Sequence, residues 1–459
     1  MIPNIYKMCL CIEICLVVWF LFAMGVPATH AGDQKGTTVS CDLATCIQIA
    51  LARHPELQVA ESRALAAQSK VEFEKAQWRP QLDFKGESGY LNGKSTGPFA
   101  VISGVTEEGV PQRQVSGGYY AGSLMLNVPI VREGKIFGWN SPSVQQARFS
   151  LTTEEQLQLT RQKQIIYNVT AAFINVLKTS EVVQENEQVV KLTEPQYQLA
   201  LAKFKQNLVS RNDLLIAEVQ LATAKRELAL ARNAMARAKS ELAGAMGLEG
   251  GSSVDILDTQ SLPAATATLP AVEELLAFAY QHRPEVQAQQ AQIQAKAEEV
   301  KRVRSERFPS LQFVAEYNFA NAFDPPVATQ WRTVAQVTGP IFDFGRNAQK
   351  VGLARAQMTE EVRRLESLKV GIAGEVQDAY TRITDTLAQL DLLDKQIEQA
   401  REALKLNQSM FAQQLLPEAT LAEVQKALTK LTQAKALAHY DLLVAYSQLG
   451  LVTGGWKRR

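Results

Sequence analysis

The chain has 459 residues with 48 Lys+Arg against 47 Asp+Glu, so its net charge is +1 at pH 7. Proteins that bind a nucleic-acid backbone usually carry a concentrated basic surplus, and the balanced charge argues against that class. Aromatic residues make up only 7% of the chain, and long tracts are dominated by Ala, Leu and Gln, which is typical of a helix-rich protein.

The first residues have the pattern of an export signal. Lys7 precedes an apolar run from Met8 to Val26, and Ala31 ends a segment suited to cleavage by a signal peptidase. We therefore predict a signal peptide over 1–31, with a retained membrane anchor as the alternative.

Two cysteines, Cys41 and Cys46, remain after such cleavage. In an oxidising compartment they could form a disulfide across a short loop. The alternatives are two unpaired structural cysteines, or a lipid on Cys41 despite the poor lipidation signal before it. The sequence leaves these alternatives open.

Internal repetition indicates that the chain is two copies of one unit. The "RHPE" and "HRPE" segments pair Pro55 with Pro284, at positions typical of helix starts. Residues 204–221 likewise parallel 411–428. The order of these matches predicts a tandem duplication.

The repeats also end alike, and the predicted pairing aligns Met246–Leu248 with Leu449–Leu451. Residues 251–270 are rich in Gly, Ser, Thr and Pro and are predicted to be a linker. The first repeat then spans 32–250 and the second spans 271–459.

Each repeat contains a very long predicted helix. Residues from about 143 to 206 and from about 347 to 414 are nearly free of glycine and proline. Helices of that length would span roughly 90–100 Å and must pack side by side as coiled coils, because no globular core is that deep. Pro195 is expected to kink or interrupt the first of them.

Four segments alternate apolar and polar residues with a period of two: about 81–90, 119–128, 311–320 and 331–339. The pattern fits tilted strands in an outer membrane, and it also fits a half-buried sheet in a soluble domain. Four strands cannot close a membrane barrel, so several copies would have to contribute. Three copies would supply twelve strands and two would supply eight. Aromatic residues at the strand ends are candidates for an interfacial girdle: Tyr90, Tyr119, Tyr120, Phe319 and Trp331.

The second and fourth strands are followed by a common pattern, in which a proline closes the strand and a glycine opens a helical stretch. Pro129 and Gly134 form the first such corner, and Pro340 and Gly345 form the second. Proline has no N–H to donate to a sheet, and glycine relaxes the backbone for a change of direction.

Together, the export signal, the tandem halves, the strand pairs, "GPIFDFGRN" and the closing "SQLGLVTGGW" resemble the TolC-type family of outer-membrane efflux and secretion channels. The resemblance implies a mainly α fold with a β membrane part. It implies a homotrimer in which four strands per subunit form one twelve-stranded β-barrel, joined to a periplasmic α-barrel of long coiled-coil helices.

The resemblance further implies an outer-membrane protein, in contact with lipid, that serves as a passive exit duct for efflux or type I secretion. Its expected partners are a periplasmic adaptor and an inner-membrane transporter. The alternative is an exported coiled-coil structural protein without a pore. No catalytic or nucleotide-binding pattern is found, and the histidines lack metal-ligand spacing, so we expect no enzyme, cofactor or metal site.

The resemblance also places a closed aperture at the tips of the helix pairs. In the first half the family's tip pattern is matched by Phe204, Asn207, Ser210, Asp213 and Leu215, with Asn in place of Gly.

In the second half, Thr420 occupies the acid position of that pattern, and an acid follows one turn later as Glu423. Glu423 is the candidate for a ring of carboxylates that favours cations, with Glu418 and Asp213 as neighbours. The alternative is that Glu423 lies on an ordinary solvated helix face.

Overall fold

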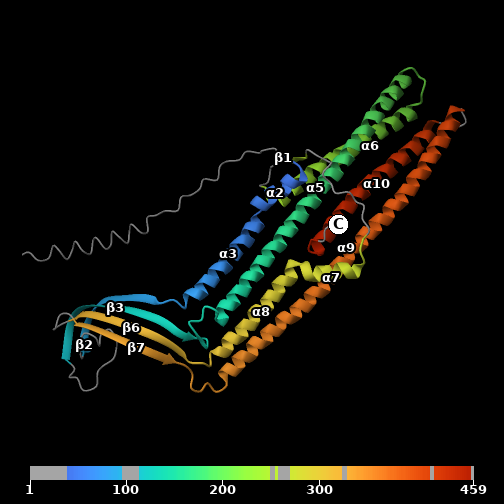
Figure 1. Cartoon of the computed structure of the whole chain (residues 1–459). Coiled ribbons are helices and arrows are strands. Elements are labelled where there is room, and N and C mark those ends of the chain that lie inside the picture. The colour runs from blue at the N-terminus through green and yellow to red at the C-terminus, as the bar shows by residue number, and fades with distance from the viewer. Residues whose placement is uncertain are drawn as a thin grey trace, which may run out of the picture.

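The computed structural model describes residues 39–95, 113–248, 254–256, 269–322, 328–413 and 418–455. The signal peptide predicted for 1–31 lies outside these residues. The molecule is elongated, with a β-sheet at one end and long helices running away from it (Figure 1). This division confirms the mainly α fold with a smaller β part.

The elements follow the same order in both repeats. The first repeat contains β1 (Val39–Cys41), α2 (Leu43–Arg53), α3 (Pro55–Ala76), β2 (Gln81–Ser95), β3 (Arg113–Arg132), β4 (Lys135–Ile136), α5 (Pro142–Lys205) and α6 (Arg211–Ala245). Strand β5 (Val254–Ile256) comes next, and the second repeat contains α7 (Val272–His282), α8 (Pro284–Ser305), β6 (Ser310–Ala322), β7 (Ala328–Thr338), α9 (Arg346–Ala412) and α10 (Glu418–Val452). Strand β5 lies inside the predicted linker and pairs in parallel with β1.

The helices form a layer in which α5 lies between α3 and α8, and α8 lies against α9. Helix α6 packs along α5, and α10 packs along α9 (Figure 1). Helix α10 also contacts α5, so the two repeats touch there. The helices that precede and follow each strand pair therefore lie side by side: α3 beside α5, and α8 beside α9.

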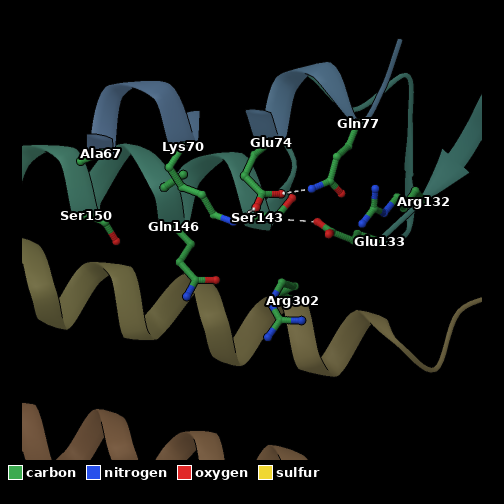
Figure 2. Close-up of a pocket in the computed structure, with 11 residues that line it drawn as sticks. Ala67, Lys70, Glu74, Gln77, Arg132, Glu133, Ser143, Gln146, Ser150 and Arg302 are labelled. Carbon is green, nitrogen blue, oxygen red and sulfur yellow. Dashed lines mark hydrogen bonds and ion pairs between the residues drawn. The ribbon is translucent and has the colours of Figure 1, made fainter. Parts of the chain in front are cut away.

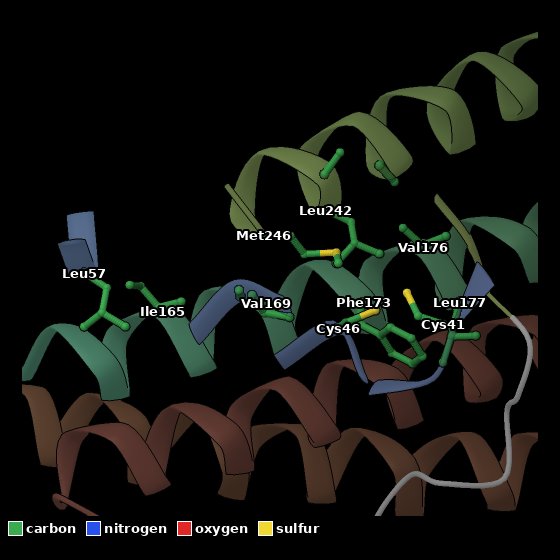
Figure 3. Packing of buried hydrophobic residues seen from close by; sticks show 13 residues of the cluster. Cys41, Cys46, Leu57, Ile165, Val169, Phe173, Val176, Leu177, Leu242 and Met246 are labelled. Carbon is green, nitrogen blue, oxygen red and sulfur yellow. The ribbon is translucent and has the colours of Figure 1, made fainter. Parts of the chain in front are cut away.

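Buried apolar side chains gather in two equivalent clusters. The first joins α2, α5 and α6 and includes Phe173 and Leu242 (Figure 3). The second joins α7, α9 and α10 and includes Ile372 and Leu442. Because each fully buried side chain of this size stabilises a fold by about 1.5–3 kcal/mol, these clusters anchor the short helices to the long ones.

Helices α5 and α9 contain 64 and 67 residues, which corresponds to lengths of about 100 Å. Pro195 lies inside α5, so the helix is not interrupted there, and a kink at Pro195 stays a prediction. Helix α6 packs along α5. Next to Pro195, Lys225 of α6 forms a salt bridge with Glu194 of α5 at 2.8 Å. Among the described residues, no helix combines the length and the apolar character needed to cross a membrane.

The four long strands form an antiparallel sheet in the order β2-β3-β6-β7, and β4 pairs with the end of β3. Strands β2 and β3, with 15 and 20 residues, extend well beyond the predicted segments. Strands β6 and β7, with 13 and 11 residues, lie close to the predicted bounds. Within the described part of the chain, the outer edges of β2 and β7 have no partner strand.

The ends of the two repeats pair differently from the sequence prediction. Helices α6 and α10 are both followed by a glycine with positive φ, Gly247 at 72° and Gly454 at 79°. Each glycine lies against a helix junction, since an added Cβ would lie 2.9 Å from the Cα of His54 or 2.8 Å from the carbonyl oxygen of His282. Gly247 is therefore the counterpart of Gly454. The predicted pairing with Leu449–Leu451 is wrong by one helical turn, because α10 continues as a helix through that segment.

Candidate functional site

One face of the sheet carries apolar side chains that continue across all four strands. Phe84 pairs with Leu124, Leu124 with Tyr317, and Tyr317 with Trp331. These four side chains are 68%, 39%, 43% and 75% exposed. A contiguous apolar surface of this kind marks contact with a partner or a membrane.

The opposite face is polar and charged. The adjacent row pairs Asp83 with Met125, Met125 with Glu316, and Glu316 with Arg332. Arg332 donates to Glu316 at 3.0 Å and 2.5 Å. Strands that present apolar residues outward and polar residues inward are the pattern of a membrane β-barrel wall.

Four of the five aromatic girdle candidates lie on the apolar face, as the register shows for Tyr90, Tyr120, Phe319 and Trp331. Tyr119 is one residue out of phase and lies on the polar face, where its ring covers Gly89. Since successive side chains of a strand point to opposite faces, the proposal of Tyr119 as a girdle residue is wrong.

The first corner lies where β3 leads into α5. Pro129 does not end the strand, because β3 continues to Arg132 across a register shift after Pro129. Such a β-bulge tolerates the missing N–H of proline within a sheet. Gly134 follows in the turn to β4 with φ at 67°, directly after Glu133 at 54°.

The second corner lies between β7 and α9. Pro340 follows the end of β7, and Gly345 directly precedes α9 with φ at 83°. Asp343 accepts hydrogen bonds from the backbone N–H of Asn347 at 2.9 Å and of Gly345 at 3.0 Å, which hold its pKa below the ordinary value. Asp343 therefore caps α9 at the sheet edge. The use of a left-handed glycine is common to both corners, whereas the position of the proline is not.

A polar cavity of about 350 Å³ lies beside the first corner, lined by side chains of α3, α5, α8 and the end of β3 (Figure 2). Lys70 contacts Glu74 at 2.9 Å, and Glu74 also accepts from Gln77 at 3.1 Å. Glu133 accepts from the backbone N–H of Ser143 at 3.2 Å. Both acids of the cavity are thus engaged in holding the corner together.

The tip of the first hairpin lies between α5 and α6. Asn207 has φ at 54°, which agrees with its predicted use in place of glycine. Asp213 accepts from the hydroxyl of Ser210 at 2.7 Å and from its backbone N–H at 3.1 Å, and these bonds lower the pKa of Asp213. Asp213 and Ser210 form a capping box, so this acid fixes the start of α6.

The tip of the second hairpin is described only in part, because 414–417 lie outside the described residues. Helix α10 begins at Glu418, and Thr420 and Glu423 follow in its first two turns with exposed side chains. The role of these three residues at an aperture stays a prediction.

An ionic cluster around the buried Arg283, at the junction of α7 and α8, was not predicted. The side chain of Arg283 is 9% exposed and contacts Glu285 at 3.2 Å and Glu375 at 2.5 Å. Burial alone would lower the pKa of Arg283, but its hydrogen bonds to both carboxylates outweigh burial and raise it. The sequence held one signal for this cluster: the residue before the proline is His in "RHPE" and Arg in "HRPE".

Lys163, on α5 of the first repeat, extends this cluster. It donates to the carbonyl oxygen of Gly454 at 2.8 Å, and burial lowers its pKa. Lys163 therefore ties the end of the second repeat to the first. Elsewhere in the described ranges, no group of three or more His, Cys, Asp or Glu side chains is arranged to hold a metal ion.

Comparison with known proteins agrees with this architecture. The family model described as outer membrane efflux protein matches residues 46–248 and 275–455. The solved outer-membrane channel OprN has a TM-score of 0.72 at 17% identity, covering 94% of this chain and 96% of that one. A structure of CusC, described as forming a transmembrane channel, has a TM-score of 0.71 at 17% identity, covering 95% and 98%.

Among curated proteins, the pyoverdine export outer membrane protein OpmQ of Pseudomonas putida is 26% identical over 223 residues. That alignment covers 44% of this chain and 45% of the relative, so the match spans less than half the length of OpmQ. The solved structures establish the fold, and the family model covers both repeats. The chain belongs to the outer membrane efflux protein family, which places it in the outer membrane.

Proposed function

We propose that the chain is one subunit of a homotrimeric duct through which solutes leave the cell across the outer membrane. The observation that carries the proposal is the sheet, which has one apolar face, one charged face and, among the described residues, two unpaired edges. An unpaired edge exposes backbone N–H and C=O groups, which lipid cannot satisfy. Strand β7 of one copy therefore pairs with β2 of the next.

The number of copies follows from the width of the closed barrel. The interior of an eight-stranded barrel is just wide enough for its own side chains to fill it. The inward face carries long side chains, among them Glu316 and Arg332, which would block so narrow a barrel. Twelve strands from three copies leave a lumen, which supports the trimer.

The long helices of three copies continue the duct into the periplasm for about 100 Å. A passive tube needs a partner that supplies energy, and the sequence has no nucleotide-binding pattern. We therefore assign the chain two partners, a periplasmic adaptor at the helix tips and an inner-membrane transporter. At those tips, three copies of Glu423 would form a ring that focuses negative potential, with Thr420, Glu418 and Asp213 nearby.

Two adjacent residues of β3 provide a matched test of the sheet faces. Leu124 lies on the apolar face and Met125 on the charged face. Leu124→Lys places a charge in lipid, at a cost of about 2–4 kcal/mol per subunit near the bilayer centre, and should abolish recovery from the outer membrane. Met125→Lys should be recovered normally and should change single-channel conductance. Equal recovery of both variants would contradict the barrel.

The assembly is tested on the detergent-extracted full chain. Native mass spectrometry should give a mass of three subunits, and planar bilayers should show discrete conductance steps. A mass of two subunits would refute the trimer alone. Full solubility without detergent, together with no conductance, would instead favour an exported coiled-coil protein without a pore.

A further inference from the structure

The two cysteines of the described chain lie on either side of the residue that caps the start of α2. Asp42 is the N-cap, and its carboxylate accepts from the backbone N–H of Thr45 at 3.0 Å. Cys41 is then the residue before the cap, and Cys46 is the fourth residue of the helix. Side chains at these two positions pack against each other in the motif called a hydrophobic staple.

The structure shows this contact in its reduced form. The Cys41 and Cys46 thiols are free and are 2% and 0% exposed. Both sulfur atoms lie in the apolar cluster beside Phe173 (Figure 3). The two thiols thus lie in the same apolar cluster, one just before and one just after the Asp42 cap of α2 (Figure 3).

We propose that Cys41 and Cys46 are joined by a disulfide in the exported protein, so that the staple of α2 is covalent. The family places the chain in the outer membrane. On the function proposed above, its helices extend into the periplasm, which is an oxidising compartment. The oxidant is a protein or small-molecule disulfide. The two thiols lose two protons and two electrons and form one S–S bond, and the oxidant's disulfide is reduced to two thiols.

The bond has to form before the core closes. Burial, together with the neighbouring Cys41, raises the pKa of Cys46, so the thiolate needed for exchange is disfavoured in the folded protein. Oxidation therefore belongs to the early stage of folding. Once buried, the disulfide would be shielded from reductants for the same reason.

The bond would act on more than α2. Cys41 is the last residue of β1 and pairs with Ile256 of β5. Strand β5 comes from the segment between the two repeats. A covalent staple at Cys41 would hold this two-stranded ladder against the core that α2 forms with α5 and α6.

Peptide mapping of the full chain tests the proposal directly. Trypsin cuts after Lys35 and Arg53, so both cysteines fall in one peptide, Gly36–Arg53. The protein is taken from outer membranes, denatured with a thiol-alkylating reagent present, and digested without reductant. We expect this peptide to be unalkylated and lighter by two hydrogen atoms than its dithiol form. It should be alkylated on both cysteines only after reduction.

Single variants supply the matched control. Cys41→Ser and Cys46→Ser should each give a peptide alkylated once without reduction, which shows that the reagent reaches this site. If the wild-type peptide is alkylated twice without reduction, the staple is only a non-covalent contact and the proposal is wrong. A peptide that begins with a lipid-bearing Cys41 would overturn it as well.

Discussion

The junction between α2 and α3 and the junction between α7 and α8 have the same backbone form and different side chains. At the first, the ring Nδ1 of His54 accepts from the backbone N–H of Glu56 at 3.2 Å. At the second, the corresponding Arg283 contacts Glu285 and Glu375. Gly247 and Gly454 press against these two junctions alike. The two junctions therefore share their backbone packing, and of the two only the second carries a buried charge.

The difference extends to the long helices. With Phe204 paired to Phe411, the position on α5 that corresponds to Glu375 is Asn168. The second junction also receives Lys163 from the first repeat. It is thus a point at which the two halves are tied together.

The largest expected effect tests what the junctions share. Gly454→Ala and Gly247→Ala each place a Cβ under 3.0 Å from backbone atoms at a positive φ. We expect each to destabilise the fold by about 2–4 kcal/mol, because strain and a steric clash add together. Thermal melting of the extracted protein measures the loss.

Gly352→Ala is the control for this pair. Gly352 lies inside α9, and an added Cβ meets no atom within 4 Å. Alanine is favoured over glycine in a helix by about 1 kcal/mol, so this variant should melt at the same or a higher temperature. If all three variants melted alike, the close approach at the junctions would not limit stability.

The next effect tests what the junctions do not share. Arg283→Ala should destabilise the protein by about 2 kcal/mol, because it removes a buried side chain and leaves the partly exposed Glu285 without its partner, whereas Glu375 is half exposed and is solvated by water. His54→Ala removes a helix cap and should destabilise it by about 1 kcal/mol. Chemical denaturation of the two variants side by side checks the order. Equal losses would show that the buried cluster adds nothing beyond a cap.

Residue patterns were sufficient to predict the elements that depend on local periodicity. The alternation in 311–320 predicted β6 closely, because apolar residues on one face and polar residues on the other alternate along the whole strand. The outer parts of β2 and β3 were missed, since Gly117 and Gly118 interrupt the pattern where pairing between strands extends the sheet. Propensity rules likewise predicted a kink or an interruption at Pro195, where α5 is continuous and packs against α6.

The candidate site was predictable where the backbone requires one residue type, and in part where strand alternation indicates an apolar face. Gly134 and Gly345 were identified because a left-handed turn favours glycine. Tyr119 was misassigned because an aromatic residue at a strand end does not reveal its face until the register is known. The contacts of Arg283 and Lys163 join segments far apart in the sequence, and a single sequence carries no signal for such pairs.

A smaller effect is expected at the seam between α5 and α10. One carboxylate oxygen of Glu185 is buried without a hydrogen-bond partner among the described residues, and burial together with Glu181 raises the pKa of Glu185. The aligned residue of the second repeat is Leu392, which is apolar and exposed. The first repeat therefore carries a carboxylate in an unfavourable setting that the second repeat lacks.

The pH dependence follows from the raised pKa. The folded state holds the proton to a higher pH than the unfolded state, so ionisation of Glu185 costs stability as pH rises above the ordinary value of 4.5 towards the raised one. Glu185→Gln removes this cost and should raise the melting temperature at neutral pH, with little change at pH 4. A gain that is independent of pH would show that packing, and not ionisation, is responsible.

The smallest effect on stability is expected at the second hairpin tip, where a substitution should change ion selectivity and leave melting unchanged. Asp213 is bound to Ser210 in a capping box, whereas Glu423 lies exposed within α10, past its first turn. Glu423→Ala should leave melting unchanged and lower the cation-to-anion permeability ratio by roughly two- to threefold, since a ring of three charges would be lost. Asp213→Ala should instead destabilise the protein by about 1 kcal/mol, with a smaller change in selectivity. Reversal potentials across a salt gradient measure both variants. An unchanged ratio for Glu423→Ala would mean that its carboxylate lies on a solvated helix face away from the ion path.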